Sequence, residues 1–173
     1  MVLSKEEAKL FFKIYISLLG YANKCIGDNK RRMLTEARHI LYDNPQIIKK
    51  IISENPDGFN SEEIEIICGW QKFIKGNFIL IGSLKKYDAF LTLDKNKTKI
   101  YGVVGLTDSP IDLAIYGIGT YFENVELLPW KNKIIWDGFV YQKPVVLGVN
   151  YLKSFNEEYK KIKQENKIVE YID

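Results

Sequence analysis

The spacing of apolar and polar residues changes once along the chain, near Gly76. Before it, apolar residues recur every three or four positions, which is the spacing of one helix face. After it, short β-branched and aromatic runs alternate with polar residues, as is typical of strands. The pattern predicts an α+β protein with a helical lobe over residues 1–74. Residues 75–173 are predicted to form an antiparallel, meander or barrel-like sheet with a C-terminal helix, packed with the lobe as one compact unit.

Four helices are predicted in the lobe. The first follows Ser4, because Ser4 and Glu7 have the spacing of a capping box. Its apolar face leaves only a narrow polar stripe, so it is either surrounded within the lobe or in contact with a partner chain. Self-association through this helix therefore stays open as a hypothesis. The other helices are predicted to begin near Leu34, at Asn44 with Pro45 in the first turn, and at Ser61.

Three strands of an antiparallel meander are predicted next. They are Phe78–Ile81, Tyr87–Leu93 and Lys99–Leu106, with a polar loop of hairpin length at 94–98. Residues 107–119 begin with turn residues and continue as an apolar run without clear periodicity. We expect a short helix or an irregular loop there.

The densest apolar pattern runs from Val125 to Tyr141, where two apolar runs flank the polar residues 131–133. We predict a hairpin in which Pro129 ends the first strand, because proline offers no amide to the ladder. Gly138 would then form a bulge that re-aims Asp137. The predicted strands are Tyr121–Leu128 and Ile134–Tyr141. A competing register places the tight turn at Asp137 and Gly138 instead.

The C-terminal region is predicted to contain a strand, a helix and a final edge strand. The first strand is Val145–Val149, and Ser154 with Glu157 resembles a second capping box. The apolar residues that follow have helical spacing, so we expect the helix to pack by one side only. The edge strand is predicted at Ile168–Ile172.

The segment from Leu127 to Gly138, with leucine, leucine, proline, an aromatic residue and KIIWDG, is similar to one in other proteins. It resembles the LLPF-type and KIIYDG-type segment near the C-terminus of an uncharacterised bacterial protein family. The resemblance implies a helical N-terminal half, with a helix and a short final strand after the segment. That family has a glycine-rich stretch after the motif, whereas residues 144–150 here contain only Gly148. No function comes with the family.

Composition is that of an ordinary globular protein, with 46% hydrophobic and 27% charged residues. The net charge of +3 gives no support to a nucleic-acid-binding role.

The chain contains no apolar run of the roughly 18–20 residues that a membrane span needs, so we expect a cytoplasmic protein without membrane contact. Cys25 and Cys68 are too far apart in sequence for a CxxC zinc motif.

An enzyme is possible but not favoured. His39 is the only histidine, which excludes any metal site that needs a second one. It has no carboxylate or cysteine constellation near it in sequence, so the pattern does not indicate a catalytic triad or dyad. A metal-dependent hydrolase or nuclease could use Asp137 with Glu123 or Glu126, and Lys133 is close in sequence. This hypothesis predicts that Asp137 lies in a cleft beside one of these glutamates. We expect no cofactor.

A nucleic-acid-binding module is a second alternative, because lysines are interleaved with aromatic residues in the predicted sheet. It requires the lysines to converge beside an exposed tryptophan. The residues concerned are Lys85, Lys86, Tyr87, Trp130, Lys131 and Lys133. Trp130, Lys131, Lys133 and Asp137 are the binding residues that the sequence nominates.

The favoured hypothesis is a non-catalytic protein-interaction or regulatory module with an unknown protein partner or a second copy of itself. It follows from the absence of a motif with specific chemistry. It predicts an exposed apolar patch of several hundred Å² and no deep polar pocket.

Overall fold

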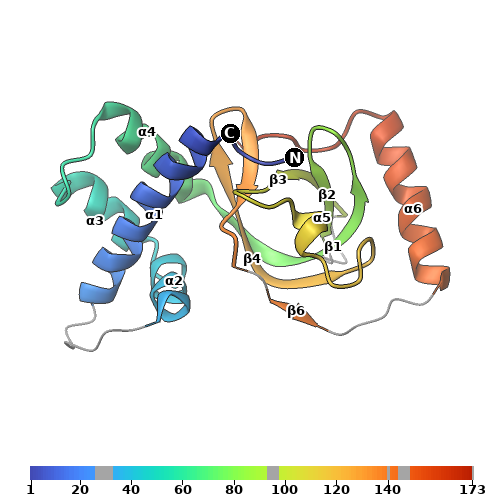
Figure 1. Cartoon of the computed structure of the whole chain (residues 1–173), viewed down its shortest axis with the longest axis horizontal. Coiled ribbons are helices and arrows are strands. Elements are labelled where there is room, and N and C mark those ends of the chain that lie inside the picture. The colour runs from blue at the N-terminus through green and yellow to red at the C-terminus, as the bar shows by residue number, and fades with distance from the viewer. Residues whose placement is uncertain (26–32, 93–97, 140, 144–148, 173) are drawn as a thin grey trace. The chain divides into compact units, whose positions relative to one another are not determined.

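The computed structural model describes residues 1–25, 33–92, 98–139, 141–143 and 149–172. The chain divides into a helical unit, Ser4–Gln71, and a β unit made of Lys72–Asp173 with Met1–Leu3. The described part is α+β, with six α-helices and a mixed sheet of six strands (Figure 1). None of its helices combines the length and apolar character that crossing a membrane requires.

The helical unit contains α1 (Lys5–Lys24), α2 (Leu34–Asp43), α3 (Gln46–Glu54) and α4 (Ser61–Gly69), followed by a 3-10 turn at Trp70–Lys72. The predicted start of α1 is confirmed. The Ser4 hydroxyl accepts a hydrogen bond from the Glu7 amide, and the Glu7 carboxylate accepts one from the Ser4 amide. Both amides would otherwise be unsatisfied at the helix start.

The broad apolar face of α1 packs inside its own unit. Phe11 stacks on Tyr15 with ring centroids 4.9 Å apart, and both rings contact the buried Trp70. Tyr15 also meets Tyr42 of α2 at 6.5 Å. Among the two alternatives for this helix, burial within the lobe accounts for most of the face.

One of the remaining predicted helix starts is shifted and one is confirmed. Asn44 does not cap α3; its side chain donates to the Ile40 carbonyl at the end of α2, and Pro45 occupies the cap position. Helix α4 begins at Ser61 as predicted, and Asn60 caps it in a capping box with Glu63. An asparagine between two helices can bond an unpaired carbonyl at the end of the first helix or an unpaired amide at the start of the second. The spacing of residues in the sequence does not show which bond it forms.

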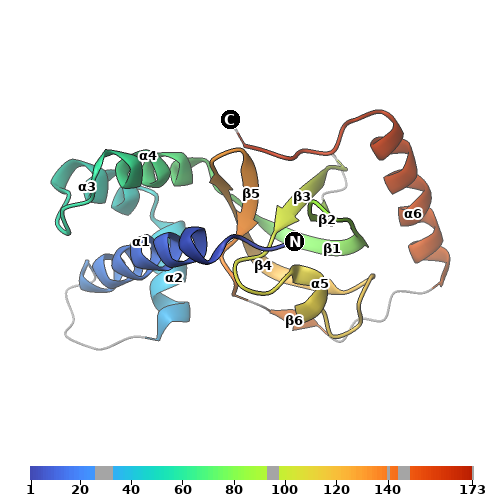
Figure 2. The ribbon, with the colours of Figure 1, turned by 45° about the horizontal axis from the view of Figure 1, so that its top comes forward.

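The sheet in the β unit is made of β1 (Ile74–Ser83), β2 (Asp88–Thr92), β3 (Ile100–Val104), β4 (Tyr121–Trp130), β5 (Lys133–Trp136) and β6 (Gln142–Lys143) (Figure 2). Their order is β1-β2-β3-β5-β4-β6, and β1 also pairs with β4. The predicted antiparallel meander of β1, β2 and β3 is confirmed.

The prediction of a wholly antiparallel sheet is wrong, because β3 and β5 are parallel. The chain passes from β3 through the short helix α5 (Pro110–Leu113) into β4 before β5 returns beside β3. A parallel pair needs such a crossover. A short helix in 107–119 was one of the two expected structures.

Side chains from alternate strand positions form two apolar clusters. One contains Phe90, Phe122 and Trp136, whose rings pack within 5.9 Å of one another. The other covers the opposite face of β1, β2 and β3, where Ile79, Ile81, Ala89, Leu91 and Ile100 are buried. The C-terminal helix α6 (Val149–Gln164) packs on this second face.

The hairpin of β4 and β5 has the first predicted register, with different limits. Pro129 lies within β4 opposite Ile134, so it does not end the ladder, and the turn is only Lys131 and Asn132. The pairing of β1 with β4 ends at Leu127, so β1 needs no amide from Pro129. Strand β5 ends at Trp136, and Gly138 lies in a bend beyond it rather than in a bulge.

Helix α6 begins before the predicted capping box, so Ser154 lies inside it. Its packing by one side, through Phe155, Tyr159 and Ile162, is confirmed. In place of the predicted edge strand, Val169 forms an isolated parallel bridge with Tyr101. The predicted loop at 94–98, except for Thr98, and the strand Val145–Val149, except for Val149, lie outside the described residues.

Candidate functional site

Asp137 and Glu126 lie directly opposite each other on neighbouring chain segments. Leu127 pairs with Trp136, and the Asp137 amide donates to the Glu126 carbonyl at 3.3 Å. Both residues are buried. Because side chains alternate along a strand, the two carboxylates leave on the face opposite Leu127 and Trp136. The structure thus brings together two of the carboxylates that the sequence nominated.

A lysine extends this pair into a row across three strands. Lys75 of β1 is opposite Glu126, and its Nζ is 3.9 Å from Glu126 Oε1. The Lys75 side chain is about one-third exposed, whereas that of Glu126 is fully buried. Like charges opposite each other destabilise a sheet, and a nearby cation reduces that cost.

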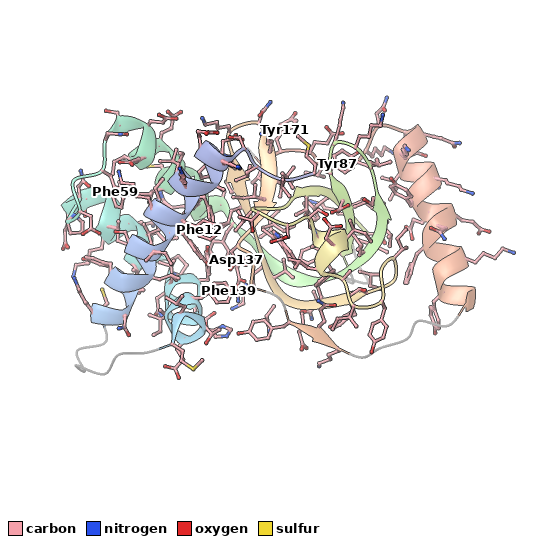
Figure 3. All side chains as sticks on the ribbon, viewed as in Figure 1. Phe12, Phe59, Tyr87, Asp137, Phe139 and Tyr171 are labelled. Atoms are coloured by element: carbon pink, nitrogen blue, oxygen red, sulfur yellow. The ribbon has the colours of Figure 1, made fainter. Side chains whose placement is uncertain are left out.

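Asp137 also has a local structural role. Its Oδ1 accepts a hydrogen bond from the Phe139 amide at 3.3 Å, and Gly138 between them has a left-handed φ of 80°. This is the short side-chain turn by which an aspartate ends a strand. The labels in Figure 3 locate Asp137 and Phe139 at this bend.

The carboxylates do not form a metal site with other described residues, among which no group of three or more His, Cys, Asp or Glu side chains could hold an ion. Glu123 lies apart, with its carboxylate 2.9 Å from Lys143 Nζ. The enzyme hypothesis predicted that Asp137 lies beside Glu123 or Glu126, and the structure places it beside Glu126. Burial of both side chains leaves them without the open cleft that a substrate would need.

The lysines and aromatic residues of the nucleic-acid hypothesis do not converge. Trp130 is fully buried, so it offers no exposed ring for stacking. Lys131 and Lys133 lie at the β4–β5 turn, next to the start of β1, because Ile74 pairs with Leu127. Lys85 and Lys86 follow the other end of β1, beyond Ser83.

A different feature of the β unit has the properties of an interaction surface. Residues Leu113–Ile118, which we call the apolar loop, join α5 to β4 and expose four large apolar side chains. The exposed fractions are 37% for Leu113, 72% for Ile115, 46% for Tyr116 and 50% for Ile118. Single exposed apolar residues are common on protein surfaces, whereas four within six positions make this segment a candidate interaction surface.

Hydrogen bonds fix the conformation of the apolar loop. Thr120 is fully buried, and its hydroxyl donates to the Gly117 carbonyl at 2.8 Å and accepts from the Tyr116 amide at 3.2 Å. Gly117 and Gly119 have φ values of 62° and 98°, which glycine adopts without steric cost. The Gly119 amide donates to the Leu80 carbonyl at 2.7 Å, which ties the loop end to β1.

The side chain of Gln142 in β6 holds the other side of the loop. Its Oε1 accepts from the Ile115 amide at 2.9 Å, and its Nε2 donates to the Leu113 carbonyl at 2.7 Å. Because the backbone is satisfied by these bonds, the apolar side chains project from a rigid support. A rigid surface loses less conformational entropy when it binds.

The sequence contains a signal for this loop that the search for chemical motifs missed. Residues 113–122 include no charged side chain in a chain that is 27% charged. Their apolar residues fit neither the helical nor the strand period, so no buried face could be assigned to them. An uncharged apolar run without periodicity is therefore a candidate exposed patch.

Comparison of the chain with protein-family models, with curated proteins and with solved structures gave no match. The resemblance of the segment Leu127–Gly138 to a bacterial family stays a prediction. The function has to be argued from the surface and the fold.

Proposed function

We propose that the protein is a non-catalytic interaction module that associates with a second copy of its own chain through the apolar loop. The observation that carries this proposal is the exposure of Leu113, Ile115, Tyr116 and Ile118 on a backbone fixed by hydrogen bonds. Burying one large aliphatic side chain contributes about 1.5–3 kcal/mol. The loop therefore gains most by meeting another apolar surface.

Charge makes a second copy the best-matched occupant. In a two-fold symmetric contact each patch meets itself, so a charged patch would repel its own copy. Residues 113–122 carry no charge and meet this requirement. Strand β6, whose Gln142 bonds the apolar loop, lies at the edge of the sheet. An edge strand offers unpaired backbone groups for pairing with another chain.

We infer further that β1, β2, β3, β5 and β4 close into a small barrel. Each strand pairs with the next in that order, and β4 pairs with β1. A five-stranded barrel with a helix before its fourth strand has the organisation of the oligonucleotide- and oligosaccharide-binding fold, whose ligands contact strands 2 and 3. Here α6 packs on the face formed by buried residues of β1, β2 and β3, so it covers part of that surface.

Sedimentation velocity over a concentration series tests self-association. We expect a monomer–dimer equilibrium with a dissociation constant on the order of 10 μM, because a contact made by one short loop belongs to the class of small, weak interfaces. Ile115→Lys should weaken the dimer at least tenfold. Ile115 is 72% exposed, so the substitution should leave the melting temperature unchanged.

Met33→Lys is the matched control, since Met33 is 70% exposed and lies in the helical unit. It should leave association unchanged. A chain that stays monomeric at several hundred micromolar overturns the proposal, as does equal weakening by Met33→Lys. Association that survives Ile115→Lys but is lost in Ile16→Lys would assign self-association to α1 instead.

A further inference from the structure

A pocket of about 420 Å³ lies in the helical unit, between α1 and the segment that joins α3 to α4. This volume is within the range of roughly 300–1,000 Å³ typical of small-molecule sites. Phe59, labelled in Figure 3, forms part of the wall on the side of the joining segment. Those of the described residues that line the pocket belong to the helical unit.

Gly20 forms part of the α1 surface that lines the pocket. Glycine is an unfavourable residue within a helix. Glycine inside a helix costs about 1 kcal/mol relative to alanine. An added Cβ would meet no atom within 4 Å, so packing inside this chain does not require the glycine. The missing side chain leaves the helix backbone open to a molecule in the pocket.

The two sides of the pocket are cross-linked by side-chain hydrogen bonds. Ser17 donates to Asp57, and Tyr21 donates to Glu54 at the end of α3. The joining segment is itself fixed by Asn55, whose side chain bonds both the amide and the carbonyl of Phe59 at 2.7 and 2.9 Å. The pocket is therefore preformed, which lowers the entropic cost of binding.

The lining selects for a particular chemistry. Tyr21, Pro56 and Phe59 supply aromatic and apolar surface. The Asp57 carboxylate already accepts the bond from Ser17, and the Lys13 ammonium is paired with the buried Glu63. Lys24 is exposed on the α1 side of the pocket, and no carboxylate of the described residues forms an ion pair with it. A negative group of a ligand would be attracted to the Lys24 ammonium.

We propose that this pocket binds a small amphipathic anion, with a flat apolar body against Tyr21 and Pro56 above Gly20 and its negative group at Lys24. Tyr21 and Pro56 contribute the buried apolar area, and the lysine selects the charged form of the ligand. No residue of the apolar loop is among the described residues that line the pocket.

The test uses 8-anilinonaphthalene-1-sulfonate, a fluorescent aromatic anion, and the uncharged N-phenyl-1-naphthylamine as its neutral counterpart. We expect saturable binding of the sulfonate at one site per chain, at least threefold tighter than the neutral probe and weakened by salt. Gly20→Leu should abolish this binding by filling the space above the helix. Lys24→Gln should remove the preference for the sulfonate.

Lys9→Gln is the matched control, because Lys9 is an exposed lysine of α1 that does not line the pocket. It should leave both affinities unchanged. Circular dichroism melting shows whether Gly20→Leu is folded, and Gly20→Ser gives a smaller obstruction that should weaken binding partially. Unchanged binding in folded Gly20→Leu overturns the proposal, and so does equal affinity for the two probes. Loss of the sulfonate signal in Ile115→Lys would assign the probe to the apolar loop and overturn it as well.

Discussion

Gly105, just after β3, occupies a position where no side chain fits. An added Cβ would lie 2.0 Å from the Asp108 carbonyl oxygen, which belongs to the backbone and cannot move aside alone. The Gly105 amide and carbonyl also bond Met1 and Leu3, both at 3.0 Å. Gly105 thus determines how closely the chain can fold back after β3.

We expect Gly105→Ala to lower the free energy of unfolding of the β unit by about 3 kcal/mol or more, because the backbone must shift to relieve the overlap. Urea denaturation followed by tryptophan fluorescence measures the change. Gly76→Ala is the control in the same sheet, because its Cβ would meet only the Phe78 ring at an ordinary 3.4 Å. Equal losses in the two variants would contradict the explanation.

Glu63 links the start of α4 to α1. Its side chain is buried, and the ammonium of Lys13 together with the Asn60 amide holds the pKa of the carboxyl below its usual 4.5. A carboxyl whose pKa is lowered by folding stabilises the protein above its unfolded-state pKa. That stabilisation is lost as the pH falls through the lower folded-state pKa.

Glu63→Gln should therefore destabilise the helical unit by about 1 kcal/mol at pH 7, since Lys13 is mostly solvent-exposed and its contribution is screened. Glutamine keeps the capping-box geometry. The difference between variant and parent should shrink as the pH falls below 4.5. Thermal melting at pH 7, 5, 4 and 3 measures it, and a difference that grows toward acid would rule out the ion pair as its source.

At the scale of elements, α6 is held to the sheet by partly buried side chains. It contacts the sheet through Phe155, Tyr159 and Ile162, each only partly buried, whereas the strand residues beneath it are almost fully buried. The Tyr159 hydroxyl is buried with no hydrogen-bond partner among the described residues, and burial raises its pKa. An unsatisfied hydroxyl costs roughly 1–3 kcal/mol.

Amides of α6 should consequently exchange with deuterium faster than those of β1 and β4, because elements with few buried contacts open locally. Tyr159→Phe should slow exchange in α6 by about fivefold or more, since it removes the unsatisfied group. Hydrogen-exchange mass spectrometry resolves both effects. Protection of α6 equal to that of β4, or faster exchange in the phenylalanine variant, would refute this view of the helix.

Element boundaries show which local signals are decisive. The capping box at Ser4 and Glu7 predicted the start of α1 because both partners lie within one helical turn. Pro129 misled the prediction for β4, because its effect depends on whether a strand on either side needs its amide. Such pairing across the sheet is not encoded within a few residues.

At the scale of the whole molecule, charge is dispersed rather than focused. The chain has a net charge of +3, and the lysines at the two ends of β1 belong to different turns. We expect no binding of a 20-nucleotide single strand below about 100 μM at 50 mM salt, because few phosphates can be contacted together. Fluorescence anisotropy measures this, and salt-sensitive micromolar binding would revive the nucleic-acid hypothesis.

The sequence by itself determined the α+β class, the four N-terminal helices, the meander and the one-sided packing of α6. Periodicity and caps act over one or two turns, so they are readable without knowing the partners. The parallel pairing of β3 with β5, the burial of Trp130 and the placing of Glu126 against Asp137 were decided only in the tertiary structure.

The candidate surfaces show the same division. The sequence nominated Asp137 and Trp130 because their residue types carry chemistry, but burial depends on residues distant in the chain. The apolar loop and the pocket above Gly20 were missed, since exposure of an apolar side chain and the space above a glycine are properties of packing. Sequence sets which local structures can form, and packing decides which side chains remain available for binding.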